Sequence, residues 1–170
     1  MIPGKSIELA DVLEFYIQME NLGVKIWIDG GWGVDALIEK QTRIHSDLDI
    51  AMEDRNLKKA VNWLVERGYK EVRRDNEWNF VLSDEEGREI DFHVFIFDEN
   101  QHVIEGIKYP DGSLEGIGRL GDHEVHCIPP DHIVRFHSGY KLRDSDFKDV
   151  KALCDKFGID YPEEYVHLKN

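Results

Sequence analysis

The sequence predicts an α+β (mixed α/β) fold, in which helices flank a mixed sheet. Two observations lead to this prediction. Segments with the period of amphipathic helices alternate with short apolar strand segments in the first half of the chain. Three further strand segments then follow one another over residues 69–97. A chain of 170 residues is long enough for one domain with a proper core.

Each expected element in the first part of the chain has a local signal. Ser6 can cap a first helix that ends before Gly23. Asp54 can cap a later helix that ends at Gly68. Between these helices, the sequence predicts a strand over 24–29, a short helix from Gly33 to about Glu39, and a strand that carries Asp47.

The expected elements of the second part are punctuated by turns. Strands are predicted near residues 69–74 and 79–82, and residues 84–87 form a turn into a strand over 88–97. Residues 98–121 are polar and rich in glycine, so we divide the chain there into a core (1–105) and a C-terminal part (106–170). That part is predicted to hold a short strand (123–127) and two helices (near 131–140 and 145–157).

Asp47 and Asp49 are the first candidate functional residues. Because successive side chains of a strand point to opposite faces, both carboxylates project from one face, about 7 Å apart. Such a pair can bind a hard divalent cation such as Mg²⁺. The preceding Gly30 and Gly31 lie at the start of a helix, where backbone N–H groups can approach a phosphate closely. Carboxylates beside a phosphate site are typical of enzymes that transfer a phosphorus group.

Asp91 is a third candidate, on an alternating strand. Ile90, Phe92 and Val94 share one face, and Glu89, Asp91 and His93 share the other. An aspartate in a largely apolar strand costs several kcal/mol to desolvate without a partner. Carboxylates on neighbouring strands would also repel one another, and a bound cation relieves this repulsion.

These motifs resemble the nucleotidyltransferase signature of the DNA polymerase beta superfamily. The finer resemblance is to the lincosamide nucleotidyltransferases, and less closely to one class of aminoglycoside nucleotidyltransferase. The strings that carry it are WIDGGWGVDAL (27–37), R-x-H-x-D-x-D-I (43–50), Asp-x-His (91–93) and FHSGY (136–140). The chain departs from many superfamily members at Gly31, where they have a serine hydroxyl.

The resemblance implies a magnesium-dependent enzyme of antibiotic resistance that moves AMP from ATP to a hydroxyl of a small acceptor and releases pyrophosphate. Two Mg²⁺ ions would be held by Asp47, Asp49 and Asp91, which are also the catalytic residues, with Asp91 or His93 as the general base. Nucleotide-binding residues would be Gly30, Gly31, Arg43 and His45. Acceptor-binding residues would be Glu89, His93, Trp78, His137 and Tyr140, the last two sharing one helix face.

A lincosamide is the favoured acceptor and an aminoglycoside the next. His93 stands where the aminoglycoside enzymes tend to be acidic, and Trp78 and Phe80 supply apolar surface. Two alternatives remain open: an enzyme that adenylylates a protein, of the toxin–antitoxin type, and an ATP-binding module without catalysis. The preferred nucleotide base and the oligomeric state, monomer or homodimer, are also open.

Composition limits the partners. The net charge is −14, from 35 acidic and 21 basic residues, and this excess of acid argues against binding to nucleic acid. It would suit a small cationic substrate, although acidic residues also serve solubility. No apolar run is long enough to span a bilayer, and the N-terminus lacks the features of a signal peptide. The two cysteines suggest no disulfide framework, so we expect a cytoplasmic protein.

Overall fold

The fold is built on one mixed sheet, seen in the computed structural model that describes residues 4–169. The sheet has eight strands in the order β3-β4-β5-β2-β1-β8-β7, with β6 paired to β5 beside this path. The strands are β1 (Ile26–Asp29), β2 (Asp47–Glu53), β3 (Lys70–Asn76), β4 (Asn79–Ser83), β5 (Glu89–Phe97), β6 (Val103–Gly106), β7 (Gly116–Leu120) and β8 (His123–Cys127). The predicted α+β class is therefore confirmed.

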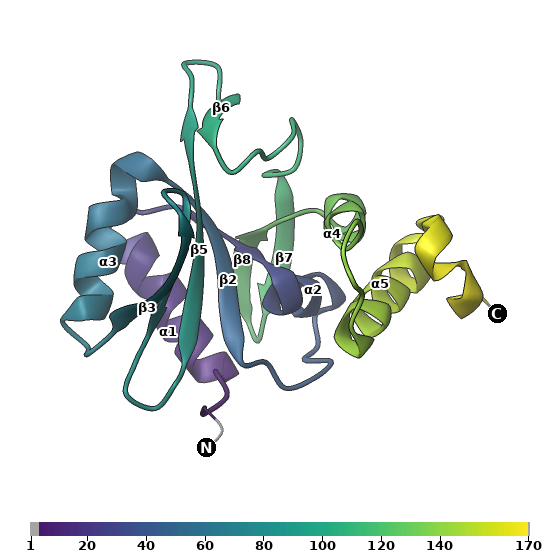
Figure 1. The fold of residues 1–170 in the computed structure, drawn as a ribbon, viewed down its shortest axis with the longest axis horizontal. Coiled ribbons are helices and arrows are strands. Elements are labelled where there is room, and N and C mark those ends of the chain that lie inside the picture. Colours follow the sequence, from purple (N-terminus) through teal and green to yellow (C-terminus); the bar gives the residue numbers. More distant parts are fainter. Residues whose placement is uncertain (1–3, 170) are drawn as a thin grey trace.

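Helices lie on both sides of the view in Figure 1. α1 and α3 lie side by side at the left, and α4 and α5 extend to the right, beyond α2. The helices are α1 (Leu9–Asn21), α2 (Gly30–Ile38), α3 (Leu57–Val65), α4 (Pro130–Phe136) and α5 (Asp144–Phe157), with short 3₁₀ segments η1 (Asp54–Asn56) and η2 (Glu163–Leu168). None of the helices in residues 4–169 is long and apolar enough to cross a membrane.

The two faces of the sheet differ in chemistry. One face, which we call the helix-covered face, is apolar: Ile28, Ile50 and Phe92 lie in register across β1, β2 and β5 and are fully buried. α2 packs so closely on this face that a Cβ atom on Gly118 of β7 would lie 2.7 Å from the backbone of Ala36. The opposite face, which we call the acidic face, carries the aspartates.

The alternation predicted for the strands is confirmed. In β2, Leu48 and Ile50 are buried in the core while Asp47 and Asp49 lie partly exposed on the acidic face. β2 and β5 are parallel neighbours, so that Asp91 comes to lie beside Asp49. The sequence thus predicted the face of each aspartate, and strand pairing brings the three carboxylates together.

Some predicted elements are corrected by the structure. The N-cap of α1 is Glu8, whose backbone N–H donates to Asp11, and not Ser6. The helix expected near residues 131–140 ends at Phe136. The polar segment after residue 98 contains β6 and β7, which were not predicted.

The predicted division of the chain at residues 105 and 106 falls within β6. Beyond it, β7 and β8 extend the same sheet, and β8 pairs in parallel with β1 through Cys127 and Ile28. The helical elements of the described C-terminal part are α4, α5 and η2, and they follow these two strands.

Candidate active site

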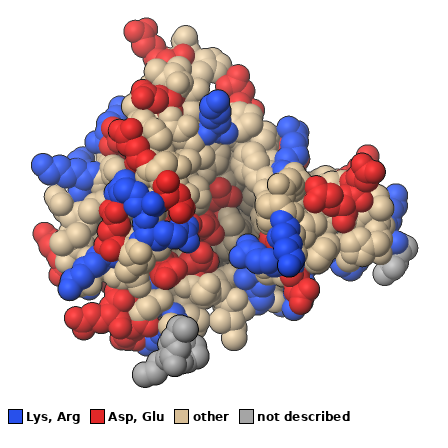
Figure 2. Space-filling view, in the orientation of Figure 1, with Lys and Arg blue, Asp and Glu red and all other residues tan. Residues whose placement is uncertain are grey.

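Three aspartates form a row across three neighbouring strands of the acidic face. Asp29 at the end of β1 pairs with Asp49 of β2, and Asp49 pairs with Asp91 of β5. Asp47 pairs with Glu89, one step further along the same face. Figure 2 shows a hollow near the centre of the view, with acidic side chains in it and basic side chains on both sides. The candidate active site is this acidic hollow.

The electrostatics of the row favour a bound cation. Enclosure by the protein, and then the carboxylates of Asp47, Asp29 and Asp91, raise the pKa of Asp49 well above 3.8. Neutral carboxyl groups or a cation are the two ways to relieve this repulsion. A cation bound at the row would therefore relieve the repulsion between its carboxylates.

The donor atoms also fit a metal ion. Asp49, Asp91 and His93 each offer a ligand atom, and the three atoms lie within 4.8 Å of one another. Carboxylate oxygens are the ligands that Mg²⁺ prefers. Asp47, on the same face of the same strand as Asp49, adds a further carboxylate at this site. The residues present thus fit a divalent cation.

Asp91 has partners that hold it in place. Its Oδ1 accepts a hydrogen bond of 2.7 Å from Asn79 of β4, and its Oδ2 accepts one of 3.1 Å from Arg73 of β3. His93 Nε2 lies 3.9 Å from Oδ1. Burial is the largest influence on the pKa of Asp91 and raises it, although His93, Asn79 and Arg73 act in the opposite direction. A carboxyl with a raised pKa is a suitable proton acceptor.

The two predicted glycines begin α2. The side chain of Asp29 caps this helix, because its Oδ1 accepts a hydrogen bond of 2.8 Å from Gly30 N–H. A Cβ atom on Gly31 would lie 2.5 Å from His45 Nδ1 and 2.6 Å from Arg43 Nη2, so a side chain there would require these two residues to shift. The free N–H groups of the first turn and its positive dipole end lie beside the aspartates, as an anion-binding helix start requires.

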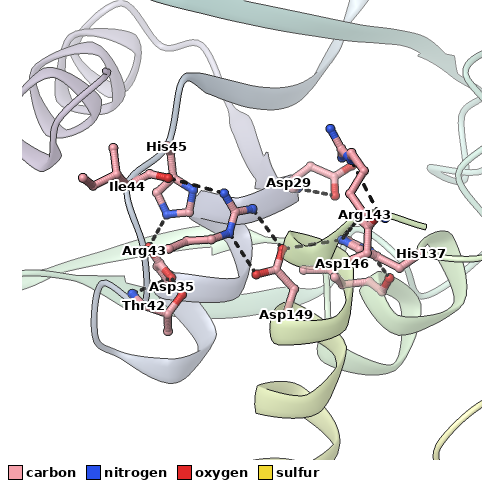
Figure 3. Close-up of polar contacts among 12 residues, drawn as sticks. Asp29, Asp35, Thr42, Arg43, Ile44, His45, His137, Arg143, Asp146 and Asp149 are labelled. Atoms are coloured by element: carbon pink, nitrogen blue, oxygen red, sulfur yellow. Dashed lines mark hydrogen bonds and ion pairs between the residues drawn. The ribbon is translucent and has the colours of Figure 1, made fainter. Parts of the chain in front are cut away.

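Arg43 lies against this helix start, as Figure 3 shows. Its Nε and Nη2 donate to the two oxygens of Asp149 on α5, at 3.2 and 3.1 Å. The side chain is about a quarter exposed (26%), so that part of it remains accessible. This position agrees with the predicted phosphate-binding role, which remains a prediction.

His45 lies in the loop before β2 with its side chain turned inward, and its predicted role in nucleotide binding stays a prediction. It is buried, it stacks near Trp32, and its Nε2 lies 2.5 Å from the fully buried Asp35. Asp35 also accepts two hydrogen bonds from Thr42. His45 therefore shapes the loop that leads to β2 and holds it against α2 instead of facing the solvent.

His137 and Tyr140 are not on one helix face, because α4 ends before both of them. They meet instead at α5: Tyr140 Oη donates to Asp146, and His137 Nε2 lies 3.8 Å from the same Asp146 Oδ1. The His137 side chain is only 12% exposed. It belongs to a largely buried network, and its predicted role in acceptor binding stays a prediction.

Two aromatic residues expected near the acceptor lie in different surroundings. Phe80 is buried on the helix-covered face, where it stacks on Phe92 with ring centroids 4.9 Å apart. Trp78 lies in the turn between β3 and β4, against Gly106 of β6. Phe80 thus fills the core, and the acceptor role of Trp78 stays a prediction.

Several site residues were missed by the sequence analysis. Asp29 ends its strand on the same face as Trp27, and this alternation could have revealed it. Tyr109 Oη donates to Asp29, and Arg143 precedes α5 and lowers the pKa of Asp49. Neither Tyr109 nor Arg143 carries a local sequence signal.

Comparisons with known proteins agree with this geometry. A family model described as aminoglycoside-2″-adenylyltransferase matches residues 11–153. A lincosamide resistance protein of Staphylococcus haemolyticus is 31% identical over 151 residues, which are 86% of this chain and 92% of that protein.

Two solved structures share the fold. The crystal structure of the lincosamide antibiotic adenylyltransferase LnuA, bound to lincomycin, superposes with a TM-score of 0.79 at 26% identity, over 88% of this chain and 98% of that one. ANT(2″)-Ia in complex with adenylyl-2″-tobramycin superposes with a TM-score of 0.75 at 15% identity, over 94% and 92% of the two chains.

Proposed function

Because the chain belongs to the antibiotic adenylyltransferase family, together with lincosamide and aminoglycoside enzymes, we propose that it transfers AMP from ATP to a hydroxyl of a lincosamide. Pyrophosphate is the second product. The observation that supports the proposal is the row of Asp29, Asp49 and Asp91 beside the start of α2, because carboxylates that could hold a cation lie next to a helix start that could bind phosphate.

The aspartates take the metal-binding role in this proposal. Asp47 and Asp49 would hold the Mg²⁺ that accompanies the triphosphate, and together with Asp91 they would hold a second ion. When bound, Mg²⁺ supplies positive charge that offsets the charge of the triphosphate and of the attacked phosphorus group. The start of α2 and Arg43 orient the phosphates, since both present N–H donors on the side where the aspartates lie.

Asp91 is the proposed proton acceptor. Its raised pKa and its fixed orientation, by Asn79 and Arg73, suit the removal of a proton from the acceptor hydroxyl. His93 lies 3.9 Å away, where it contacts the acceptor or assists Asp91. Attack by the hydroxyl oxygen on the α-phosphorus forms the new ester bond, and the bond to pyrophosphate breaks.

An aromatic hollow on the acidic face supports a lincosamide. Trp27, Phe97 and Tyr109 line a hollow of about 410 Å³, and Tyr109 connects it to the aspartate row through its hydrogen bond with Asp29. His102 and Asp111 lie at the same hollow and can bind polar groups. Further polar and charged side chains line the hollow, among them Lys25, Gln101 and Glu115, so it offers both apolar surface and polar groups to an acceptor that carries a thioether and a single amine.

The charges near the site do not separate the two acceptors, because Asp111 and Glu115 at the hollow add carboxylates to those of the acidic face. An aminoglycoside carries several ammonium groups and calls for several carboxylates beyond those that bind metal. On the acidic face, strand pairing places Asp29 and Glu89 next to the metal-binding aspartates. Asp146 and Asp149 of α5 are buried and paired with His137 and Arg43, so they cannot serve a polycation.

The test is incubation with ATP and Mg²⁺ and, in separate reactions, lincomycin, clindamycin, kanamycin and tobramycin, with mass detection of the products. We expect an added AMP group on the lincosamides. Transfer to kanamycin or tobramycin but not to lincomycin would instead assign an aminoglycoside acceptor. An AMP group found on a co-purified protein, with no transfer to any drug, would favour the protein-adenylylating alternative.

A further inference from the structure

α5 buries two carboxylates on its inner side. Asp146 and Asp149 are 1% and 2% exposed, and they share this side of the helix with Val150 and Leu153. A buried carboxylate costs several kcal/mol unless cations and hydrogen-bond donors compensate it. The groups that compensate these two carboxylates therefore indicate the role of the helix.

Asp149 is held by two basic side chains from distant parts of the sequence. Arg43, 106 positions earlier, donates to both of its oxygens, and His137 Nε2 lies 3.7 Å from Oδ2. Burial alone would raise the pKa of Asp149, but His137 and Arg43 outweigh it and the pKa is lowered. The carboxylate thus stays ionised in the network that Figure 3 shows.

The orientation of Arg43 is fixed from both sides. Asp149 binds Nε and Nη2 in a two-point contact, and Nη1 lies 3.5 Å from the carbonyl oxygen of Ile44. On the other side, Nη2 lies only 2.6 Å from the position that a Cβ atom of Gly31 would take. A planar guanidinium held at two points has little freedom to turn, unlike a flexible surface side chain.

We propose that Asp149 is a positioning residue, which holds Arg43 against the first turn of α2 so that the guanidinium is ready to meet the triphosphate. The helix α5 thereby completes the phosphate site, although it contributes no group that touches the nucleotide. This inference rests on the proposed function, because it assumes that the start of α2 binds ATP.

Two effects of Asp149 on ATP binding have opposite signs. A carboxylate that only neutralises Arg43 weakens its attraction for phosphate, so that its removal would tighten ATP binding. A carboxylate that positions Arg43 makes binding stronger, since a free arginine must lose rotamer entropy when ATP binds. We expect the positioning effect to be larger because the two-point contact is largely enclosed.

The test measures Mg·ATP binding by calorimetry, together with kcat and KM for each substrate. Asp149→Asn should raise the Kd and KM for ATP about tenfold, which equals about 1.4 kcal/mol, and change kcat and the acceptor KM less than threefold. Arg43→Lys should raise the KM for ATP similarly, because an ammonium cannot form the two-point contact. The effect of Asp149→Asn should disappear in an Arg43→Ala background.

A matched control lies on the same helix. Asp155 is an exposed carboxylate paired with Lys151, so Asp155→Asn removes the same charge from α5 without touching Arg43, and its ATP binding should equal that of the wild type. Tighter ATP binding by Asp149→Asn would overturn the proposal, as would a lower melting temperature with unchanged ATP binding. The binding measurement needs no antibiotic, so a wrong acceptor leaves this test intact.

Discussion

The Oδ2 atom of Asp49 occupies the space where Gly30 would carry a side chain. The backbone of Gly30 also has φ +57°, a left-handed conformation that favours glycine. The start of α2 and the metal-binding aspartate therefore fit together only because residue 30 has no Cβ atom. The proposed phosphate site and the proposed metal site therefore depend on the same glycine.

Gly30→Ala should for this reason lose activity as well as stability. The left-handed backbone alone costs about 1–2 kcal/mol with a Cβ atom, and the collision with Asp49 adds to this. We expect the activity to fall about a hundredfold, because Asp49 must move. The matched control is Gly158→Ala: φ is +65° there but nothing lies within 4 Å of the new Cβ. It should lower the melting temperature while kcat/KM stays unchanged. Equal activity of the two variants would contradict the prediction.

Asp49→Asn should separate stability from function. The folded-state pKa of Asp49 is raised, so at neutral pH its charge opposes folding of the metal-free protein and is relieved only by protonation or by a cation. The variant should therefore have a melting temperature without Mg²⁺ at least as high as that of the wild type. Its Mg²⁺-dependent release of pyrophosphate should fall about a hundredfold to a thousandfold.

Two variants complete this comparison. Asp47→Asn should lose activity in the same way, and Glu99→Gln, at an exposed residue away from the row, should keep it. Calorimetric unfolding with and without Mg²⁺, and a pyrophosphate assay, provide the measurements. Full activity of Asp49→Asn or Asp47→Asn would refute the assigned metal-binding roles.

Local sequence signals predicted the aspartates on β2 and β5 because strand alternation is a local property. Spacing alone assigned Asp47 and Asp49 to one face of their strand, and Asp91 to the polar face of its own strand. The register that brings Asp29 beside Asp49 depends on the pairing of β1 with β2, which the spacing does not specify. Predicting the row required the distance between strands as well as the face of each residue.

The segment after residue 98 misled the prediction for a packing reason. Gly116 and Gly118 read as turn signals, but Gly118 lies in β7, where the backbone of α2 at Ala36 leaves no room for a Cβ atom. Glycine permits close packing of the helix on the sheet there. A single sequence does not distinguish a glycine of this kind from one in a turn.

Local sequence signals could not predict the contact between Arg43 and Asp149, since the two residues lie 106 positions apart in the sequence. A partial signal existed on α5. Asp146, Asp149, Val150 and Leu153 follow the spacing of one helix face, so that two carboxylates stood at positions that the apolar residues mark as buried. Such a buried acid calls for a basic partner, but the sequence does not name Arg43.

Phe97→Ala should affect the acceptor and not the nucleotide. Phe97 lines the aromatic hollow and contacts Trp27, with ring centroids 6.2 Å apart. Removing the ring should raise the KM for lincomycin about tenfold, because the lost apolar contact is worth about 1–2 kcal/mol. The KM for ATP should stay the same. Ile104→Ala, at an exposed position on β6 outside the hollow, is the control. An unchanged KM for lincomycin would show that the acceptor does not bind in the hollow.

His137 should make the stability of the protein depend on pH. Its Nδ1 lies 2.8 Å from the carbonyl oxygen of Ile133, and Nε2 lies 3.8 and 3.7 Å from carboxylate oxygens of Asp146 and Asp149. Both ring nitrogens therefore face acceptors, which suits the doubly protonated ring. Burial lowers the pKa of His137, but the two carboxylates and the carbonyl outweigh it, so the pKa lies above 6.5.

Three other titratable groups near His137 do not change their ionisation near neutral pH. Arg43 remains positive, and Tyr140 and Tyr165, which also contact this network, have raised pKa values, that of Tyr165 being about 12. Change in the network near neutral pH thus comes from His137 itself. Because the folded-state pKa is raised, its stabilisation is complete below pH 6.5 and is lost as the pH rises through the folded-state value.

Urea unfolding of the wild type and of His137→Gln, at intervals from pH 6 to pH 9, measures this contribution. The free energy of unfolding should differ most between the two proteins at the lowest pH, and the difference should shrink as the pH rises. Each unit by which the pKa is raised corresponds to about 1.4 kcal/mol. His102 also has a raised pKa, through Asp111, but it is exposed to solvent and screened, so His102→Gln should leave the pH dependence of the wild type intact. A difference that stays constant across the range would mean that His137 is neutral in the fold. The two carboxylates of α5 would then depend on Arg43 and their hydrogen-bond donors alone.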